Sequence, residues 1–244
     1  MASWLNDSIK TRQQNTQYMS KHLQRDLDHL QRQLMNLFGI VEQMIDNATR
    51  ALCEKRLDLV TNIRAIDRQV NEMEVAIEED CLKMLALHQP VAGDLRRIAS
   101  VLKINTDLER IGDIAKNVAE RAQGVHEFPW FPIPDRLAEM SRQARQMLRM
   151  ALDAFVTSDS QLAKQVILCD ASVDELNRGI ILELQDLMRS DGSLLDPALH
   201  CFSASRHLER IGDHAENIAE DVIYLVDGDI VRHKHGAFST GKTN

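Results

Sequence analysis

Apolar residues recur at alternating intervals of four and three along most of the chain, which is the pattern of helices that bury one face. The first series runs Leu23, Leu27, Leu30, Leu34, Leu37, Val41, Met44 and Ala48, and the next runs Leu59, Ile63, Ile66, Val70, Met73, Ile77, Cys81 and Met84. Pro90 disfavours helical backbone at the residue before it, so the second helix should end near His88. A third helix is expected from about Asp94 to about Gln123.

A segment of different composition follows. Residues 124–134 read GVHEFPWFPIP and hold three of the chain's five prolines, which predicts a linker. Beyond it we expect a fourth helix capped by Asp135, a fifth beginning at Ser158 or Asp159, and a sixth opened by Asp196-Pro197 after a turn at Asp191-Gly192. The sixth helix should fade near Gly228.

Six long helices, three on each side of the linker, predict an all-α fold of two tandem antiparallel three-helix bundles. The predicted order is a loose polar N-terminal arm (1–20), a first unit (21–123), the linker (124–134), a second unit (135–228) and a polar tail (229–244). A first helix of about 30 residues would be roughly 45 Å long, so the molecule should be elongated.

Composition narrows the possible roles. The net charge of −8 argues against a protein that tracks a nucleic-acid backbone. Cys53, Cys81, Cys169 and Cys201 form no CxxC pair, so we expect reduced thiols. The first residues lack the apolar core of a signal peptide, and no run of about 18 apolar residues could span a membrane. We therefore expect a cytoplasmic protein.

One stretch occurs twice, one hundred residues apart. Residues 107–120 read DLERIGDIAKNVAE and residues 207–220 read HLERIGDHAENIAE, with ten of fourteen positions identical. Such internal similarity indicates two copies of one folding unit. Each copy also places a glutamate and an aspartate four residues apart, as Glu109 and Asp113 and as Glu209 and Asp213.

The predicted turns set these acids against others on the neighbouring helix. Counted from a turn near residue 90, Asp113 stands level with Asp67, and Glu109 with Asn71. Counted from Asp191-Gly192, the second unit sets Asp213 level with Asp170, and Glu209 level with Asp174.

Clustered carboxylates repel one another, so some cation must offset them. One interpretation is a metal ion, because oxygen-rich clusters bind Mg²⁺, Mn²⁺ or iron and helical bundles build metal sites from facing carboxylates. The other is a solvated face neutralised by side chains such as Arg110, Arg210, Arg97 and Lys116.

Other candidates carry less weight. Glu42 and Asp46 have the same spacing but no counterpart in the fourth helix, which favours surface charge. His207 and His214 are replaced by Asp107 and Ile114 in the first copy, which favours incidental residues over ligands. Gly112 and Gly212 cost helix stability, and close helix approach is the favoured reason. No Glu-x-x-His element, phosphate loop or nucleophile motif supports catalysis.

The repeated LERIGD followed by A-x-N-x-A-E closely resembles the PhoU family of bacterial phosphate-uptake regulators. VEQ (41–43), NEMEVAIEE (71–79) and HQPVAGDLR (88–96) resemble it too. The resemblance implies two three-helix bundles and metal, as iron, manganese, magnesium or zinc, on Glu109-Asp113, Glu209-Asp213 and Asp170-Asp174. Asp67-Asn71 departs from the family pattern by one amide, so its site should be weaker or lost.

The resemblance also implies a role. Such a protein represses the phosphate-starvation response as a non-enzymatic adaptor between the ATPase subunit of the phosphate ABC transporter and a phosphate-sensing histidine kinase. It would act at the inner-membrane surface as a homodimer. Two rivals stay open: a carboxylate-bridged metalloenzyme or metal store, and a helical spacer without metal.

Overall fold

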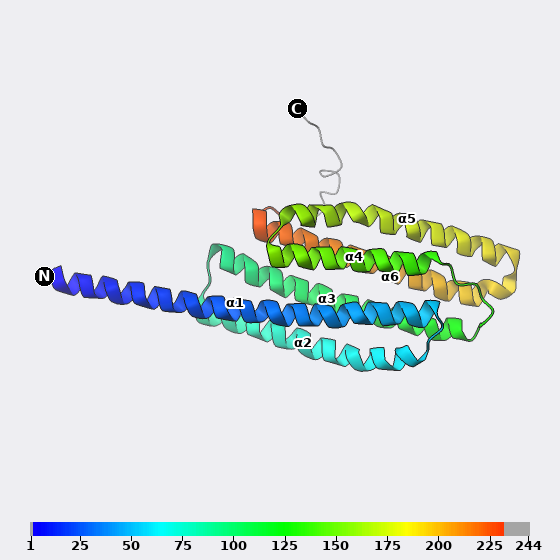
Figure 1. Cartoon of the computed structure of the whole chain (residues 1–244), viewed down its shortest axis with the longest axis horizontal. Helices are drawn as coiled ribbons and strands as arrows, with labels where there is room; N and C mark the ends of the chain where they lie inside the picture. Colours follow the sequence, from blue (N-terminus) through cyan, green and yellow to red (C-terminus); the bar gives the residue numbers. More distant parts are fainter. Residues whose placement is uncertain (1, 232–244) are drawn as a thin grey trace, which may run out of the picture.

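The structure, a computed structural model, describes the backbone of residues 2–231 and the side chains from residue 21 onward. These residues form six long α-helices joined by short connections, with no strand among them (Figure 1). The helices are α1 (Ala2–Cys53), α2 (Asp58–His88), α3 (Ala92–His126), α4 (Arg136–Thr157), α5 (Ser160–Ser190) and α6 (Leu195–Asp227), with a short 3₁₀ turn η1 (Gly192–Leu194) before α6.

Several helix ends follow the signals in the sequence. α2 stops at His88, and Gln89 before Pro90 turns into the left-handed region with φ of 45°. Asp159 caps α5, because its side chain accepts hydrogen bonds from the backbone N–H groups of Gln161 and Leu162. Gly228 ends α6 with φ of 79°, a conformation that costs glycine little.

The N-terminal prediction was wrong in one respect. Residues 2–20 are not a loose arm but the first part of α1, which has 52 residues in all and projects beyond the other helices (Figure 1). The segment holds no Pro or Gly to stop a helix, so nothing ends α1 where its apolar stripe ends.

Smaller differences lie at other ends. α3 continues to His126, three residues into the expected linker. Asp135 precedes α4 but makes no side-chain cap hydrogen bond. α6 begins at Leu195, so Asp196 lies in its first turn instead of capping it.

The two bundles lie side by side along their length (Figure 1). α1, α2 and α3 pack together in the first unit, and α4, α5 and α6 in the second. α3 also packs along α6 and α1 against α4, so the two units share one continuous core. Leu34, Ile104, Leu148 and Ile211 are among its fully buried side chains. α2 and α5 are left on the outside.

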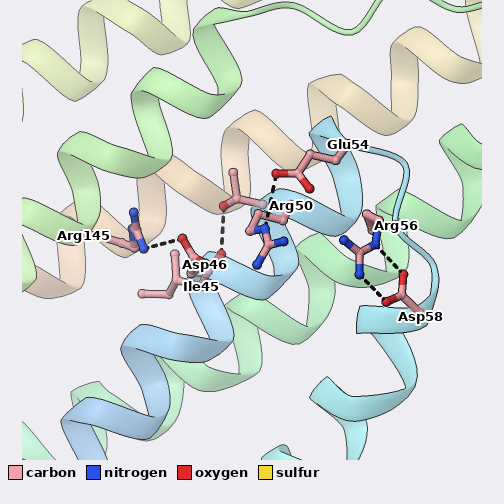
Figure 2. Close-up of polar contacts among 8 residues, drawn as sticks. Ile45, Asp46, Arg50, Glu54, Arg56, Asp58 and Arg145 are labelled. Atoms are coloured by element: carbon pink, nitrogen blue, oxygen red, sulfur yellow. Dashed lines mark hydrogen bonds and ion pairs between the residues drawn. The ribbon is translucent and has the colours of Figure 1, made fainter.

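Ion pairs strengthen the contact between α1 and α4. Arg145 Nη1 lies 2.6 Å from Asp46 Oδ1 (Figure 2), and Arg149 Nη2 lies 2.5 Å from Glu42 Oε1. Glu42 and Asp46 are therefore charges that join the two halves, and not part of the acid clusters on α2 and α3.

Candidate functional site

The first acid cluster lies between α2 and α3 and contains its own cation. Lys116 Nζ donates to both carboxylate oxygens of Asp67 at 3.0 Å and to Asp113 Oδ1 at 2.9 Å. Asp67 and Asp113 are thus level, as the turn geometry predicted. Burial alone would lower the pKa of Lys116, but its hydrogen bonds to Asp113 and Asp67 outweigh that effect and raise it. The ammonium group therefore stays charged.

The rest of this cluster is less tightly held. Asn71, one turn along α2 from Asp67, is exposed. Burial raises the pKa of Glu109, with a further contribution from Asp113, while Arg110, whose Nε is 3.7 Å from Glu109 Oε2, opposes it. Burial, together with the charges of Glu78 and Glu109, also raises the pKa of Glu74. Glu74 is a cluster residue that the sequence analysis did not single out.

The second cluster repeats this arrangement between α5 and α6 without the lysine. Asp170 and Asp174 on α5 take the places of Asp67 and Asn71, and α6 supplies Glu209 and Asp213. The position of Lys116 is occupied by Glu216. The exchange changes the local charge by two units, from a cation that joins two carboxylates to a further carboxylate.

The electrostatic consequence is greatest at Asp170. Burial raises the pKa of its carboxyl group from 3.8 to about 7, with contributions in decreasing order from Glu216, Asp174, Asp213 and Glu209. This set of charges shows that the predicted residues are gathered at one place. Burial also raises the pKa of Asp213 and of Glu209, and neighbouring acids add to both shifts.

Two buried oxygens at this cluster lack a hydrogen-bond donor. Asn177 beside Glu209 is only 3% exposed, and its Oδ1 has no partner. Arg206 donates to Glu209 Oε1 at 2.6 Å; its Nη1 also lies 2.5 Å from Oε2, but outside hydrogen-bond geometry. The second cluster is therefore rich in acceptors and short of donors.

The repeated glycines allow the helices to approach closely. A Cβ at Gly112 would lie 3.3 Å from Val70 Cγ1, and one at Gly212 would lie 3.4 Å from both Asp170 Oδ1 and Val173 Cγ1. Close packing, the favoured interpretation of these glycines, is what the structure shows. At Gly212 it also brings the helix backbone against the Asp170 carboxylate.

The two clusters differ in how well they suit a cation. Lys116 already fills the first, so a metal ion there would have to displace an ammonium group from two carboxylates. The second offers carboxylate and amide oxygens, the donors that hard cations prefer. Among the described side chains, however, no three His, Cys, Asp or Glu residues are already arranged as a metal-binding group. The second cluster thus has the donor chemistry of a cation site, but its side chains would have to move closer together to hold an ion.

The neutralising side chains are only partly those expected. Lys116 and Arg110 lie at the first cluster, and the charge of Arg210 lowers the pKa of Asp213 at the second. Arg97 instead donates to Gln31 at 2.5 Å. The sequence analysis missed Arg206, which pairs with Glu209, and the additional acid Glu216. Glu216 could have been found, because it stands at one of the four positions where the two copies of the motif differ.

The two histidines beside the motif face the seam between α3 and α6. His214 Nδ1 lies 2.8 Å from Asp107 Oδ1, which joins the two halves. Burial lowers the pKa of His207, and Arg210 and Arg121 add to this effect. His207 does not act on the second cluster, whereas the charge of His214 lowers the pKa of the neighbouring Asp213.

Two matches to the PhoU domain cover residues 34–122 and 137–222, one for each bundle. This chain belongs to the PhoU family. It is 40% identical over 219 residues to the phosphate-specific transport system accessory protein PhoU homolog of Pseudomonas aeruginosa, covering 89% of this chain and 90% of that protein. The corresponding Escherichia coli K12 protein is 34% identical, covering 90% of this chain and 91% of that protein.

Solved PhoU structures share the fold. The crystal structure from Pseudomonas aeruginosa, 40% identical, superposes with a TM-score of 0.79 over 84% of this chain and 99% of that chain. The phosphate transport system regulatory protein PhoU from Streptococcus pneumoniae, 26% identical, gives 0.80 over 86% and 99%. PhoU proteins are accessory and regulatory proteins and not enzymes, as predicted here. None of the helices in the described part of the chain has an apolar stretch able to cross a bilayer.

Proposed function

We propose that this PhoU-family protein restrains the phosphate-starvation response when phosphate is plentiful. In this proposal it is a cytoplasmic adaptor that contacts the ATPase subunit of the phosphate ABC transporter and a phosphate-sensing histidine kinase. It holds the kinase away from autophosphorylation. The observation that carries the proposal is the match of both bundles to the PhoU domain, together with relatives named as accessory proteins of phosphate-specific transport.

The test is a starvation reporter such as alkaline phosphatase, measured in phosphate-rich medium. Deletion of the gene should make expression constitutive, and the intact gene should restore repression. A reporter that stays repressed after deletion would contradict the regulatory role. It would leave the family assignment intact.

The second acid cluster is the part of the molecule that we propose binds metal. Asp170, Asp174, Glu209 and Asp213 would hold a divalent or multinuclear ion such as iron, manganese, magnesium or zinc, with Glu216 adjacent. The ion would offset the burial and the repulsion between carboxylates that together raise the pKa of Asp170, and it would join α5 to α6. In the first cluster Lys116 provides the same neutralisation for Asp67 and Asp113, so we propose no resident metal there.

Two matched double variants separate the clusters. Glu209→Gln with Asp213→Asn should lower bound metal, measured by elemental analysis of the purified protein. Glu109→Gln with Asp113→Asn, the same changes one hundred residues earlier, should leave it unchanged. Equal metal content in both variants would contradict the assignment to the second cluster.

Attachment at the inner membrane is a further part of the proposal. With a net charge of −8, the chain as a whole is repelled by anionic lipid headgroups. A metal ion on the second cluster could bridge its carboxylates to such a surface. Binding to anionic vesicles should then require the metal and be lost on chelation. Self-association into a homodimer is tested separately, by light scattering of the purified chain.

A further inference from the structure

The seam between the two bundles is the contact of α3 with α6, the two helices that carry the repeated motif. The helices run antiparallel, because His214 meets Asp107 at one level and Lys103 meets Asp221 further along. Positions one hundred residues apart are equivalent in the repeated motif. Since the two helices are antiparallel copies of one another, the two ends of the seam would be expected to carry the same residues. In the structure the residues at the two ends differ in charge.

One end of the seam is balanced in charge. Lys103 Nζ donates to Asp221 Oδ1 at 2.8 Å, and the Asp221 side chain is 2% exposed. The same ammonium group lies 5.3 Å from the centroid of the Tyr224 ring. Asp107 and His214 form the neighbouring pair at 2.8 Å. Acidic and basic side chains thus face each other across the two helices.

The other end lacks the equivalents of the two acids Asp107 and Asp221. Ser203 stands in the place of Lys103, Arg121 in the place of Asp221, and His207 in the place of Asp107. The ring of His200 occupies the space that a Cβ on Gly124 would fill, which fixes the register of the helices here. One turn along the antiparallel pair, Arg121 therefore stands level with Ser203. His207 lies one turn further along α6, close enough for the charge of Arg121 to act on it.

Hydrogen-bonding groups at this end are left unused. Arg121 Nε and His207 Nδ1 are both buried, and neither has a hydrogen-bond partner. Such groups are costly to bury unpaired, so each calls for an explanation. On α6, Ser203, His207 and Arg210 follow one another at intervals of four and three. They therefore share the helix face that borders Arg121.

The local charge is positive although the protein is acidic. Glu120 lies 4.0 Å from the guanidinium groups of both Arg64 and Arg121, which is too far for a hydrogen bond. Arg210, a third guanidinium, is close enough for its charge to act on His207. Glu120 is thus shared between two guanidinium groups, and Arg210 adds a third positive charge beside His207 while also acting on Asp213. This gathering of arginines lies in a chain whose net charge of −8 otherwise repels anions.

We propose that this end of the seam is a binding site for a tetrahedral oxyanion of the phosphate class. Arg121 and Arg210 supply planar, permanently charged forks that suit phosphate oxygens, and Ser203 and His207 supply further polar groups. The ligand is inorganic phosphate or the phosphoryl group of a small monoester. The site lies on the seam between the halves, on the face of α6 that carries Ser203 and His207. Arg210 stands between this face and the acid cluster, because its charge also lowers the pKa of Asp213.

The experiment is isothermal titration calorimetry on the full purified chain at low ionic strength, with sodium phosphate and phenyl phosphate as separate ligands. The wild type should show saturable binding to one site. Arg121→Gln should weaken binding at least tenfold, because it removes a charged hydrogen-bond donor. Arg178→Gln, the same change at an exposed α5 arginine paired with Glu175, should have no effect.

Ser203→Asp is the most specific variant. Its carboxylate would face Arg121 as Asp221 faces Lys103, so it should abolish phosphate binding while maintaining or raising the melting temperature. If this variant does not fold, Arg121→Gln against Arg178→Gln decides the matter alone. Tighter binding of sodium phosphate would indicate free phosphate as the natural ligand, and tighter binding of phenyl phosphate would indicate a phosphorylated metabolite.

Two results would overturn the proposal. One is no saturable heat with either ligand up to tens of millimolar. The other is equal binding by wild type and a folded Ser203→Asp protein. Neither outcome alters the starvation-reporter result, so the regulatory role and this site stand or fall separately.

Discussion

Lys116 Nζ lies 3.0 Å from each carboxylate oxygen of Asp67, on the neighbouring helix. With its third contact, to Asp113, this one side chain neutralises the two acids that face each other across α2 and α3. Position 216 in the second bundle is a glutamate, and Asp170, the counterpart of Asp67, has a pKa of about 7. The exchange at this one position of the repeat therefore leaves the second cluster without the lysine that neutralises the first.

Lys116→Met should destabilise the protein by about 1–2 kcal/mol in urea unfolding at pH 7, because two half-buried carboxylates lose a charged donor. Lys83→Met is the control. Lys83 is 62% exposed and pairs only within its own helix, so its loss should cost no more than about 0.5 kcal/mol. Similar losses for both would show that the Lys116 contacts contribute nothing beyond a surface pair.

Asp170→Asn should stabilise the metal-free protein at high pH. The folded-state pKa of about 7 exceeds the ordinary 3.8, so between these values the folded protein holds a proton that the unfolded chain has lost. Wild-type stability therefore falls as the pH rises through this window, and the cost is fully present above about pH 7. The variant should gain up to about 4 kcal/mol at pH 8 and almost nothing at pH 3.

Urea unfolding of Asp170→Asn across pH 3–8, in the presence of a chelator, checks this sign. Asp186→Asn is a suitable control, because Asp186 is an α5 aspartate with a 78% exposed side chain. A gain that is the same at every pH would mean that the substitution acts through packing and not through ionisation.

Lys116→Glu should give the first bundle a cluster like that of the second. The variant removes the internal ammonium group and adds a carboxylate beside Asp67 and Asp113, so bound metal should rise relative to wild type. Elemental analysis after equilibration with Mn²⁺ measures the change. Lys116→Met separates loss of the cation from gain of a ligand, since it should bind less metal than Lys116→Glu. Unchanged metal in Lys116→Glu would mean that the acid cluster alone does not determine metal binding.

Alanine at two helical glycines should have different effects. A Cβ at Gly39 meets nothing within 4 Å, so Gly39→Ala should stabilise the protein by about 1 kcal/mol through helix propensity. At Gly112 the Cβ would lie 3.3 Å from Val70 Cγ1, closer than an ordinary contact. That crowding should cancel or reverse the gain. Thermal unfolding of the two variants gives the comparison directly. Equal gains in melting temperature would show that Val70 can move aside without loss of stability.

Much of the site was already visible in the sequence, because helices convert sequence spacing into position. The pairing of Asp67 with Asp113 and the gathering of Asp170, Asp174, Glu209 and Asp213 follow from counting outward from two turns. Lys116 was named only as one of four possible neutralising side chains. Arg206 and Asn177 were missed, because their contribution depends on side-chain direction and burial, which spacing does not give.

The sequence alone determined that the chain forms two three-helix units and that acids face one another across adjacent helices in each. The helical periodicity, the two turn signals and the hundred-residue repeat were sufficient for this. These are local properties, set by neighbours along one chain segment. The tertiary structure decided how the units meet. The α3–α6 seam, the α1–α4 ion pairs and the charge imbalance around Arg121 and His207 join residues up to 129 positions apart. Such contacts follow from how two amphipathic surfaces pack, and no single helix encodes that choice.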